Sequence, residues 1–405
     1  MTLTLKDILL KAGTLIVGDG TTLSGASILI NGDSISEVGQ DVSIPSDTDV
    51  LDFSDRVVMP GLIDPHIHVC FDGSADPGEA RQFSDELLAI RGSQLVEKLL
   101  QYGITTAGDA AGRGNVPFAV KDAIEKGLVN GPCLLLCGRM ITITGGREAL
   151  GGSNEANGVD DVRRAVREEI GRGVHFIKLA ATGAISSKHT ESMSAQFDQD
   201  ELQAAADETR KVGKMSHAHA YGDVGIRNTI LAGVDVLVHG HPLNKENLEL
   251  MKKHGTMYMP TVVTYYESQL HHDDGDLPEY MVRKEKEIFP LIEEGVKNAV
   301  KAGIDLVVGT DSGMPYTYYG KSTPEEMELF VRLGGASEMD AIIAGTKNAA
   351  RALKIDSRVG TIEPGKSADL LVLAPGKNPL EDITVLQDKE SISRVILRGK
   401  TVIEH

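Results

Sequence analysis

Residues 60–68 read Pro60-Gly-Leu-Ile-Asp-Pro-His66-Ile-His68, an apolar run that ends in two histidines spaced two residues apart. On a β-strand, residues two apart point to the same face, so the two imidazoles would lie side by side. At the carboxyl end of a barrel strand, such a pair can bind one metal ion through neutral imidazole nitrogens. The alternative is a pair of partly buried structural histidines, because the His-x-His sequence is common. The residues at the ends of the later strands therefore decide between the two.

From about residue 58 to residue 356, short apolar runs alternate with longer amphipathic stretches, which is typical of parallel strands joined by helices. Helix starts are indicated by Asp198 with Glu201 three residues on, and by Thr323 followed by proline. Eight runs are candidate strands, over residues 57–68, 104–106, 134–136, 176–179, 215–219, 236–239, 257–259 and 306–311. The sequence therefore predicts an α/β fold with a closed, TIM-like (β/α)8 barrel.

The two ends of the chain share a different pattern. Short β-rich runs separated by turn residues fill the first fifty-odd and the last fifty residues, for example at 14–17, 27–30, 369–373 and 393–397. A barrel takes about 250 residues, so a chain of 405 has room for a second module. We expect residues 1–57 and 357–405 to form one small β-sandwich domain and residues 58–356 to form the barrel.

Composition limits the classes of partner. The formal net charge of -18 repels phosphate backbones and anionic membrane surfaces, so nucleic-acid and membrane binding are not expected. No stretch is apolar enough for a secretion signal or a membrane span. The three cysteines have no zinc-finger spacing and suit a reducing compartment. We therefore expect a cytoplasmic protein that acts on a small molecule.

Four of the later candidate strands end in residues that can bind metal ions, namely Lys178, His219, His239 and Asp311. Because barrel enzymes assemble their sites from strand ends, this set favours the metal site over the structural interpretation of His66 and His68.

The chain resembles the amidohydrolase superfamily, in particular its prolidase-like and metallocarboxypeptidase-like branch. The resemblance follows the family's order over nearly the whole chain. It rests on the 60–68 segment and on Gly-Ile-Thr-Thr at 103–106, Phe-Ile-Lys-Leu-Ala-Ala-Thr-Gly at 176–183, His-Ala-Tyr-Gly at 219–222, Val-His-Gly at 238–240, Gly-Thr-Asp-Ser-Gly at 309–313 and Gly-Thr-Ile-Glu-Pro-Gly-Lys-Ser-Ala-Asp-Leu at 360–370.

The resemblance implies two divalent ions, most simply Zn²⁺. The more buried ion would be bound by His66, His68 and Asp311, and the second ion by His219 and His239. Lys178 would bridge the ions as N6-carboxylysine, and the alternative is a lysine paired with a buried carboxylate. His217 also matches the start of the strand-five motif, but the spacing to the sixth strand favours His219 and leaves His217 one layer deeper.

The same resemblance implies a mechanism in which a hydroxide between the ions attacks a carbonyl. Asp311 would take the proton of the hydroxide and return it to the leaving amine. The hydroxyl of Tyr221 would help to polarise the carbonyl, although a tyrosine at that position could equally pack in the core.

Substrate contacts are expected from loops, where this chain departs from its relatives. Arg147 stands where an imidazole is frequent and could bind a substrate carboxylate or pair with Glu148 or another surface acid. Gly108-Asp109 replaces a frequent Arg-Asp. Tyr265 and Tyr319, with their neighbours Tyr266 and Tyr318, would line an aromatic pocket or contact another subunit. By contrast, we expect His271-His272-Asp273-Asp274 to be a solvated loop.

The leading hypothesis is a metal-dependent amidohydrolase that cleaves the peptide-like bond of a dipeptide or N-acyl amino acid, as a metallo-dipeptidase or carboxypeptidase does. The same site could hydrolyse a carbamate, a urea or a cyclic amide. A catalytically silent barrel that acts as a binding protein is the alternative from another class. By resemblance alone, we expect a homo-oligomer.

Overall fold

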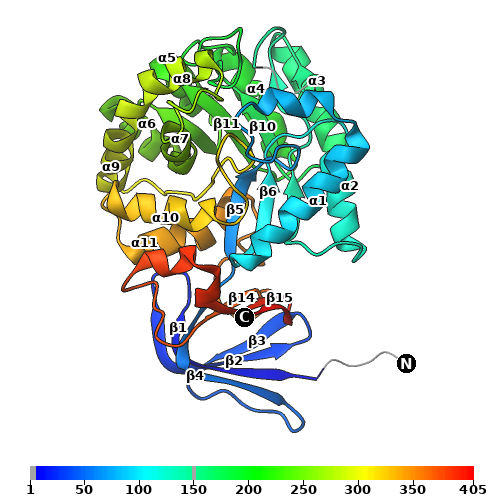
Figure 1. Ribbon diagram of the computed structural model, residues 1–405, viewed down its shortest axis with the longest axis vertical. Coiled ribbons are helices and arrows are strands. Elements are labelled where there is room, and N and C mark those ends of the chain that lie inside the picture. Colours follow the sequence, from blue (N-terminus) through cyan, green and yellow to red (C-terminus); the bar gives the residue numbers. More distant parts are fainter. Residues whose placement is uncertain (1–5, 148–151) are drawn as a thin grey trace.

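The computed structural model describes residues 6–147 and 152–405. It places a barrel of strands and helices above a sheet that is built from both ends of the chain (Figure 1). No helix within the described ranges is both long and apolar enough to cross a membrane.

The barrel strands run parallel, and all but the first lie close to their predicted positions. They are β5 (Leu62–Ile67), β6 (Ile104–Asp109), β7 (Cys133–Leu136), β10 (Ile177–Ala180), β11 (Ser216–Tyr221), β12 (Val236–His241) and β13 (Met257–Met259). The short strands β8 (Ile141–Thr142) and β9 (Asn154–Glu155) extend the sheet next to β10. The amide of His175 bonds to the carbonyl of Leu136 at 2.7 Å and so links β7 to the start of β10.

An extended segment, residues 305–312, closes the barrel between β13 and β5. Val307 N donates to Tyr258 O at 2.8 Å on one side, and Asp311 N donates to His66 O at 2.9 Å on the other. This segment is the eighth predicted strand, and the barrel prediction is confirmed.

Helices follow the strands. They are α1 (Asp85–Gln101), α2 (Val116–Glu125), α3 (Val159–Gly171), α4 (Gln199–Lys211), α5 (Gly222–Leu231), α6 (Lys245–His254), α7 (Val262–Gln269), α8 (Glu279–Ile288), α9 (Ile292–Ala302), α10 (Ser322–Arg332), α11 (Glu338–Ile343) and α12 (Ala349–Ala352). Short 3-10 or π turns lie at η1 (Pro77–Gln82), η2 (Phe289–Leu291), η3 (Ala344–Asn348), η4 (Ile383–Gln387) and η5 (Lys389–Ser391).

Of the two predicted helix starts, one is correct. At α4, the Glu201 carboxylate accepts from the Asp198 amide at 2.8 Å and completes the expected capping box. The Thr323 cap is wrong, because α10 already begins at Ser322. The Thr323 hydroxyl donates instead to the buried Asp64 carboxylate at 2.9 Å.

Strands from both chain ends form one seven-stranded sheet in the order β16-β15-β14-β4-β1-β2-β3. The strands are β1 (Ile8–Ile16), β2 (Thr22–Asn31), β3 (Ser34–Gly39), β4 (Asp49–Pro60), β14 (Leu370–Leu373), β15 (Ile392–Leu397) and β16 (Lys400–Glu404). One face has its own core, which includes Leu10, Ile28, Leu370 and Ile396. The other face packs on the barrel core through residues such as Met59 and Leu371.

The first predicted strand is two strands in the structure. Val57–Met59 belong to β4 of the end sheet, and β5 of the barrel starts at Leu62. Between them, the Gly61 amide donates to the carbonyl of Asp369 at 2.9 Å. A Cβ on Gly61 would lie 2.2 Å from the Thr105 hydroxyl, so only glycine fits where the chain passes from one sheet to the other.

Candidate active site

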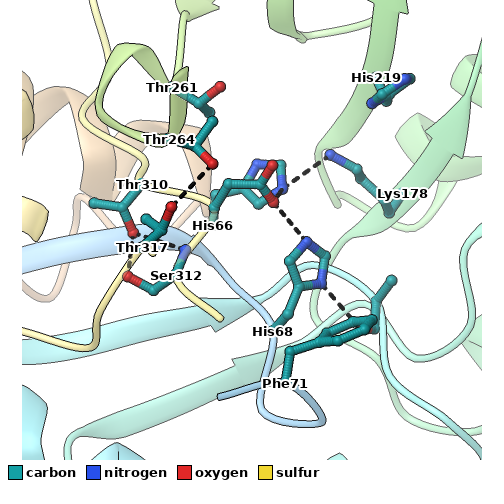
Figure 2. Close-up of polar contacts among 12 residues, drawn as sticks. His66, His68, Phe71, Lys178, His219, Thr261, Thr264, Thr310, Ser312 and Thr317 are labelled. Carbon is teal, nitrogen blue, oxygen red and sulfur yellow. Dashed lines mark hydrogen bonds and ion pairs between the residues drawn. The ribbon is translucent and has the colours of Figure 1, made fainter. Parts of the chain in front are cut away.

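His66, His68 and Asp311 meet at the carboxyl end of β5, where the barrel closes. Asp311 Oδ1 lies 3.2 Å from His66 Nε2 and 2.8 Å from His68 Nε2. Figure 2 shows the imidazoles of His66 and His68 facing the same space, with the side chain of Lys178 approaching from β10. Each residue offers one ligand atom, these atoms lie within 4.8 Å of one another, and all three residues are buried. This is a donor set that suits Zn²⁺ and similar ions.

Two residues of the site have a strained backbone, and a buried carboxylate, Asp64, helps to hold the cluster in place. Asp311 has a φ of 64° and His239 a φ of 65°, a region that costs non-glycine residues about 1–3 kcal/mol each. Next to Asp311, the amide and hydroxyl of Thr310 donate to Asp64 at 3.3 and 2.7 Å, and the His66 amide donates to Asp64 at 3.1 Å. Asp64 therefore ties β5 to the closing segment at the site.

Lys178 is fully buried on β10, and its Nζ lies 3.5 Å from His66 Nε2. Among the residues that the structure describes, no carboxylate lies within ion-pair distance of that nitrogen, so the paired-lysine alternative has no partner here. Burial lowers the pKa of Lys178 to about 7, and the nearby positive charge of Arg147 acts in the same direction. Its amine is therefore available in the neutral form near neutral pH.

His219 on β11 and His239 on β12 form the second pair, with ring centroids 4.6 Å apart. His219 Nε2 lies 2.8 Å from the Gly183 carbonyl, which makes Nε2 the protonated nitrogen and leaves Nδ1 as the acceptor. His239 Nδ1 lies 2.7 Å from the Thr261 hydroxyl, and its buried Nε2 has no partner within the described chain. Burial holds the pKa of both imidazoles well below the usual range, so both are neutral.

Arg147 reaches this second pair. Its Nη1 lies 3.0 Å from His219 Nδ1, and the residue is 7% exposed. The expected alternative partner, Glu148, lies outside the described residues. Tyr221 stacks on His239 with ring centroids 5.1 Å apart, and its hydroxyl is bonded to that of Tyr265.

Two cavities open beside the cluster. The larger, of about 410 Å³, includes His68, Cys70, Arg113, Arg147 and Met314 in its lining. The smaller, of about 30 Å³, is lined by residues that include Arg147, His219, Tyr221, His239, Tyr265 and Asp311. Arg147 lines both, so the predicted arginine contact lies where a ligand in either cavity can reach it.

Some predicted positions lie elsewhere. The Tyr319 hydroxyl donates to the backbone carbonyls of His68 and Phe71, so it supports the loop after β5 and lines neither cavity. His217 Nε2 lies 2.8 Å from the Ala352 carbonyl, away from His239. The solvated-loop prediction is wrong for His272, whose side chain is 7% exposed and lies 2.6 Å from Glu285.

Sequence reasoning missed Thr261, Gly183 and Glu285. The first two set which nitrogen of each imidazole is free, and Glu285 lines the smaller cavity. Thr261 could have been noticed because it follows the end of the seventh strand. Glu285 had no sequence cue, since it lies inside an ordinary amphipathic helix, α8.

Comparisons with known proteins identify the family of the chain. The model of the amidohydrolase family matches residues 57–402. Ochratoxinase of Aspergillus niger is 31% identical over 429 aligned residues, covering 98% of this chain and 86% of the relative. A solved Xaa-Pro dipeptidase with bound methionine has a TM-score of 0.89 and 30% identity, covering 99% of this chain and all of that one. A prolidase complexed with N-methylphosphonate-L-proline has a TM-score of 0.88 and 28% identity, covering 99% of this chain and 100% of that one. The family model covers most of the chain, including the buried cluster of His66, His68 and Asp311. The chain therefore belongs to the amidohydrolase family and is a C–N bond hydrolase.

Proposed function

We propose that the protein hydrolyses the amide bond of a dipeptide or N-acyl amino acid with the help of two divalent cations. The observation that carries the proposal is the meeting of two sets of buried imidazoles with Asp311 and Lys178 at one end of the barrel, beside cavities lined by Arg147.

The residues fit a pair of cations, most simply Zn²⁺. His66, His68 and Asp311 would hold one, and His219 and His239 the other. His219 Nδ1 carries no proton, because Nε2 donates to Gly183, and His239 Nε2 has no partner among the described residues. When bound, such ions supply a water of lowered pKa and polarise a carbonyl. The Arg147 guanidinium, 3.0 Å from His219 Nδ1, would have to turn away from that nitrogen and toward the cavity.

Asp311 is the proton carrier of the proposed reaction. Burial raises the pKa of its carboxyl, but the facing imidazoles of His66 and His68 outweigh burial and keep the pKa well below its usual range. Asp311 is therefore ionised and can accept a proton from the attacking water and deliver it to the leaving amine. Tyr221, whose buried hydroxyl lines the smaller cavity, would donate a hydrogen bond to the carbonyl oxygen.

Lys178 is proposed to become N6-carboxylysine. Its neutral amine would attack the carbon of carbon dioxide and release one proton, forming a carbamate with two oxygens and a negative charge. An anionic group at this position, between the two sets of imidazoles, can bridge two cations. The absence of a carboxylate partner in the described chain removes the usual reason for burying a lysine.

Arg147 is proposed to bind the carboxylate of the leaving amino acid through its planar guanidinium. The relatives support an amino-acid product: one solved neighbour is a dipeptidase with bound methionine, and another is a prolidase with a phosphonate analogue that ends in proline. Methionine and the proline analogue each carry a carboxylate, which is the group that Arg147 would bind.

The test combines metal analysis with product detection. We expect about two divalent ions per chain and release of free amino acid from a library of dipeptides and N-acyl amino acids that end in proline or methionine. Two ions without any amino-acid release would contradict the amide substrate and favour a carbamate, urea or cyclic amide. A chain that binds no metal under any loading condition would contradict the mechanism and favour a binding protein.

Variants test the roles. His66→Ala and Asp311→Asn should abolish turnover while leaving the circular dichroism spectrum unchanged, and the exposed His254→Ala should be neutral. Lys178→Ala should lose turnover and regain part of it with added short carboxylic acids. Full activity of Lys178→Ala without any added acid would contradict the bridging carbamate.

A further inference from the structure

The smaller cavity contains a buried anion that the proposed reaction does not use. Glu285, on α8, is 6% exposed and lines this cavity together with His219, His239 and Asp311. Its Oε2 accepts hydrogen bonds from the Ser268 hydroxyl at 2.8 Å and from His272 Nε2 at 2.6 Å. Within the described chain, Oε1 has no hydrogen-bond partner. One carboxylate oxygen is thus fixed by the protein, and the other remains free to bind a ligand.

Such an arrangement is costly unless something binds it. Taking a carboxylate out of water is unfavourable, and burial raises the pKa of Glu285 accordingly. Ser268 and His272 offset part of that cost and fix the orientation of the group. A ligand cation at the free oxygen would offset the remainder through a charge-assisted hydrogen bond.

The cavity also contains a positive side chain. Arg147 and Glu285 both line the smaller cavity, and Arg147 also lines the larger one, so a positive and a negative side chain border the same site. In a dipeptide, the ammonium and carboxylate groups lie on opposite sides of the scissile bond. An N-acyl amino acid carries the carboxylate alone. A positive and a negative side chain around one reacting centre therefore match a zwitterion better than a monoanion.

We propose that Glu285, held by Ser268 and His272, binds a protonated amine on the acyl side of the scissile bond, so that the enzyme selects dipeptides over N-acyl amino acids. The inference rests on the proposed amide hydrolysis and adds a specificity residue to it. Glu285 contacts the substrate amine and not the reacting carbonyl, so its loss should act on substrates that carry the amine and spare those that do not.

The experiment compares three substrates with the same leaving residue and nearly the same shape: L-alanyl-L-methionine, L-lactyl-L-methionine and propionyl-L-methionine. The acyl groups carry an ammonium, a hydroxyl and a hydrogen at the same carbon. We expect the metal-loaded wild-type enzyme to favour the alanyl substrate over the propionyl substrate by roughly 10- to 100-fold in kcat/KM, as a hydrogen bond to a charged group implies. Equal rates in the wild type would overturn the inference even if no variant folds.

Glu285→Gln should remove this preference. It should lower kcat/KM for the alanyl substrate mainly through KM and leave the propionyl substrate within about threefold. The matched control is Glu287→Gln, because Glu287 lies on the same helix but pairs with Arg283 at the surface, with a side chain 55% exposed. A similar fall for all three substrates would assign Glu285 a structural role and overturn the inference.

Calorimetric titration with the same three compounds separates this inference from the proposed function. If no compound is hydrolysed, the proposed amide hydrolysis fails, and the affinity ratio still tests Glu285. Tighter binding of the alanyl compound that is lost in Glu285→Gln supports the amine site. Equal affinities for the alanyl and propionyl compounds reject it.

Discussion

Glu326 links the stability of the fold to the geometry of the second imidazole pair. This fully buried residue of α10 accepts the first two amides of α7, with Oε1 2.9 Å from Val262 N and Oε2 2.7 Å from Val263 N. The residue before them, Thr261, has a φ of 52° and bonds to His239. The carboxyl group of Glu326 therefore fixes the helix start that orients a proposed ligand.

Replacing Glu326 with Gln should change how stability depends on pH. Burial raises the pKa of Glu326 from 4.5 to about 8, against the hydrogen bonds from Val262 and Val263, which lower it. Because the folded pKa is the higher one, the folded state binds the proton more tightly than the unfolded state. This contribution to stability is complete below pH 4.5 and is lost as the pH rises through about 8.

The whole pKa difference between the folded and unfolded states corresponds to ~5 kcal/mol of unfolding free energy. Of this, ~3 kcal/mol is lost between about pH 5.5 and pH 8. Glutamine has no such ionisation, so the free energy of unfolding of Glu326→Gln should rise by ~3 kcal/mol relative to wild type over that range. At about pH 5.5, the variant should be less stable than wild type by about 1–3 kcal/mol. The glutamine NH2 group replaces one of the two accepting oxygens and leaves one backbone amide of α7 unpaired.

Urea unfolding at several pH values, followed by circular dichroism, measures this difference. The control is Glu328→Gln on the same helix, where a surface pair with Arg332 contributes less than about 1 kcal/mol. Parallel stability curves for wild type and Glu326→Gln would refute the reasoning, because they would mean that the buried carboxyl binds its proton equally well in the folded and unfolded states.

Three further predictions concern the surroundings of the site. Lys284→Met should lower the free energy of unfolding by about 3 kcal/mol, because the Lys284 ammonium donates to three backbone carbonyls of residues 184–190. The control is Lys286→Met, since Lys286 is exposed on the same helix. An unchanged urea midpoint for Lys284→Met would contradict this. Gly183→Ala should weaken binding of the cation proposed at His219 and His239 more than binding of the other. The new Cβ would lie 2.1 Å from the Glu191 carbonyl, so the Gly183 carbonyl that bonds to His219 would have to move. Loss of both ions in equal measure, by metal analysis, would argue against this. Removal of metal by a chelator should abolish turnover and lower the Tm, and both should recover when Zn²⁺ is added back; a Tm that does not respond would mean that the buried ligands gain nothing from the ions.

The barrel and most of the proposed ligands could be predicted from sequence because each depends on local pattern. Strand periodicity located the barrel strands, and His66, His68, Lys178, His219 and Asp311 stand at or near the ends of such runs. The first strand was mislocated for a local reason as well. Val57–Met59 and Leu62–Ile67 form one apolar run, and only the tight contact of Gly61 with Thr105 shows that the run crosses from one sheet to another.

Contacts between distant segments had no such pattern. Thr323 lies in a sequence typical of a helix cap, but its hydroxyl donates to Asp64, 259 residues earlier in the chain. A buried carboxylate must be hydrogen-bonded, and Thr323 is one of its donors. Tyr319 lies in an aromatic loop, yet its hydroxyl donates to the backbone carbonyls of His68 and Phe71. In both cases the local sequence offers a polar group, and burial elsewhere in the fold decides its partner.

The alternation of strands and helices, the family and the residue types at the strand ends could all be predicted from the sequence, because periodicity and motif order are properties of the chain. The folded structure was needed to show which nitrogens of His219 and His239 carry the proton. It also showed that Lys178 lacks a carboxylate partner among the described residues and that Glu285 and Arg147 border one cavity. The physical reason is that hydrogen bonding, burial and charge depend on distances between segments far apart in the chain, and these distances exist only when the barrel has closed.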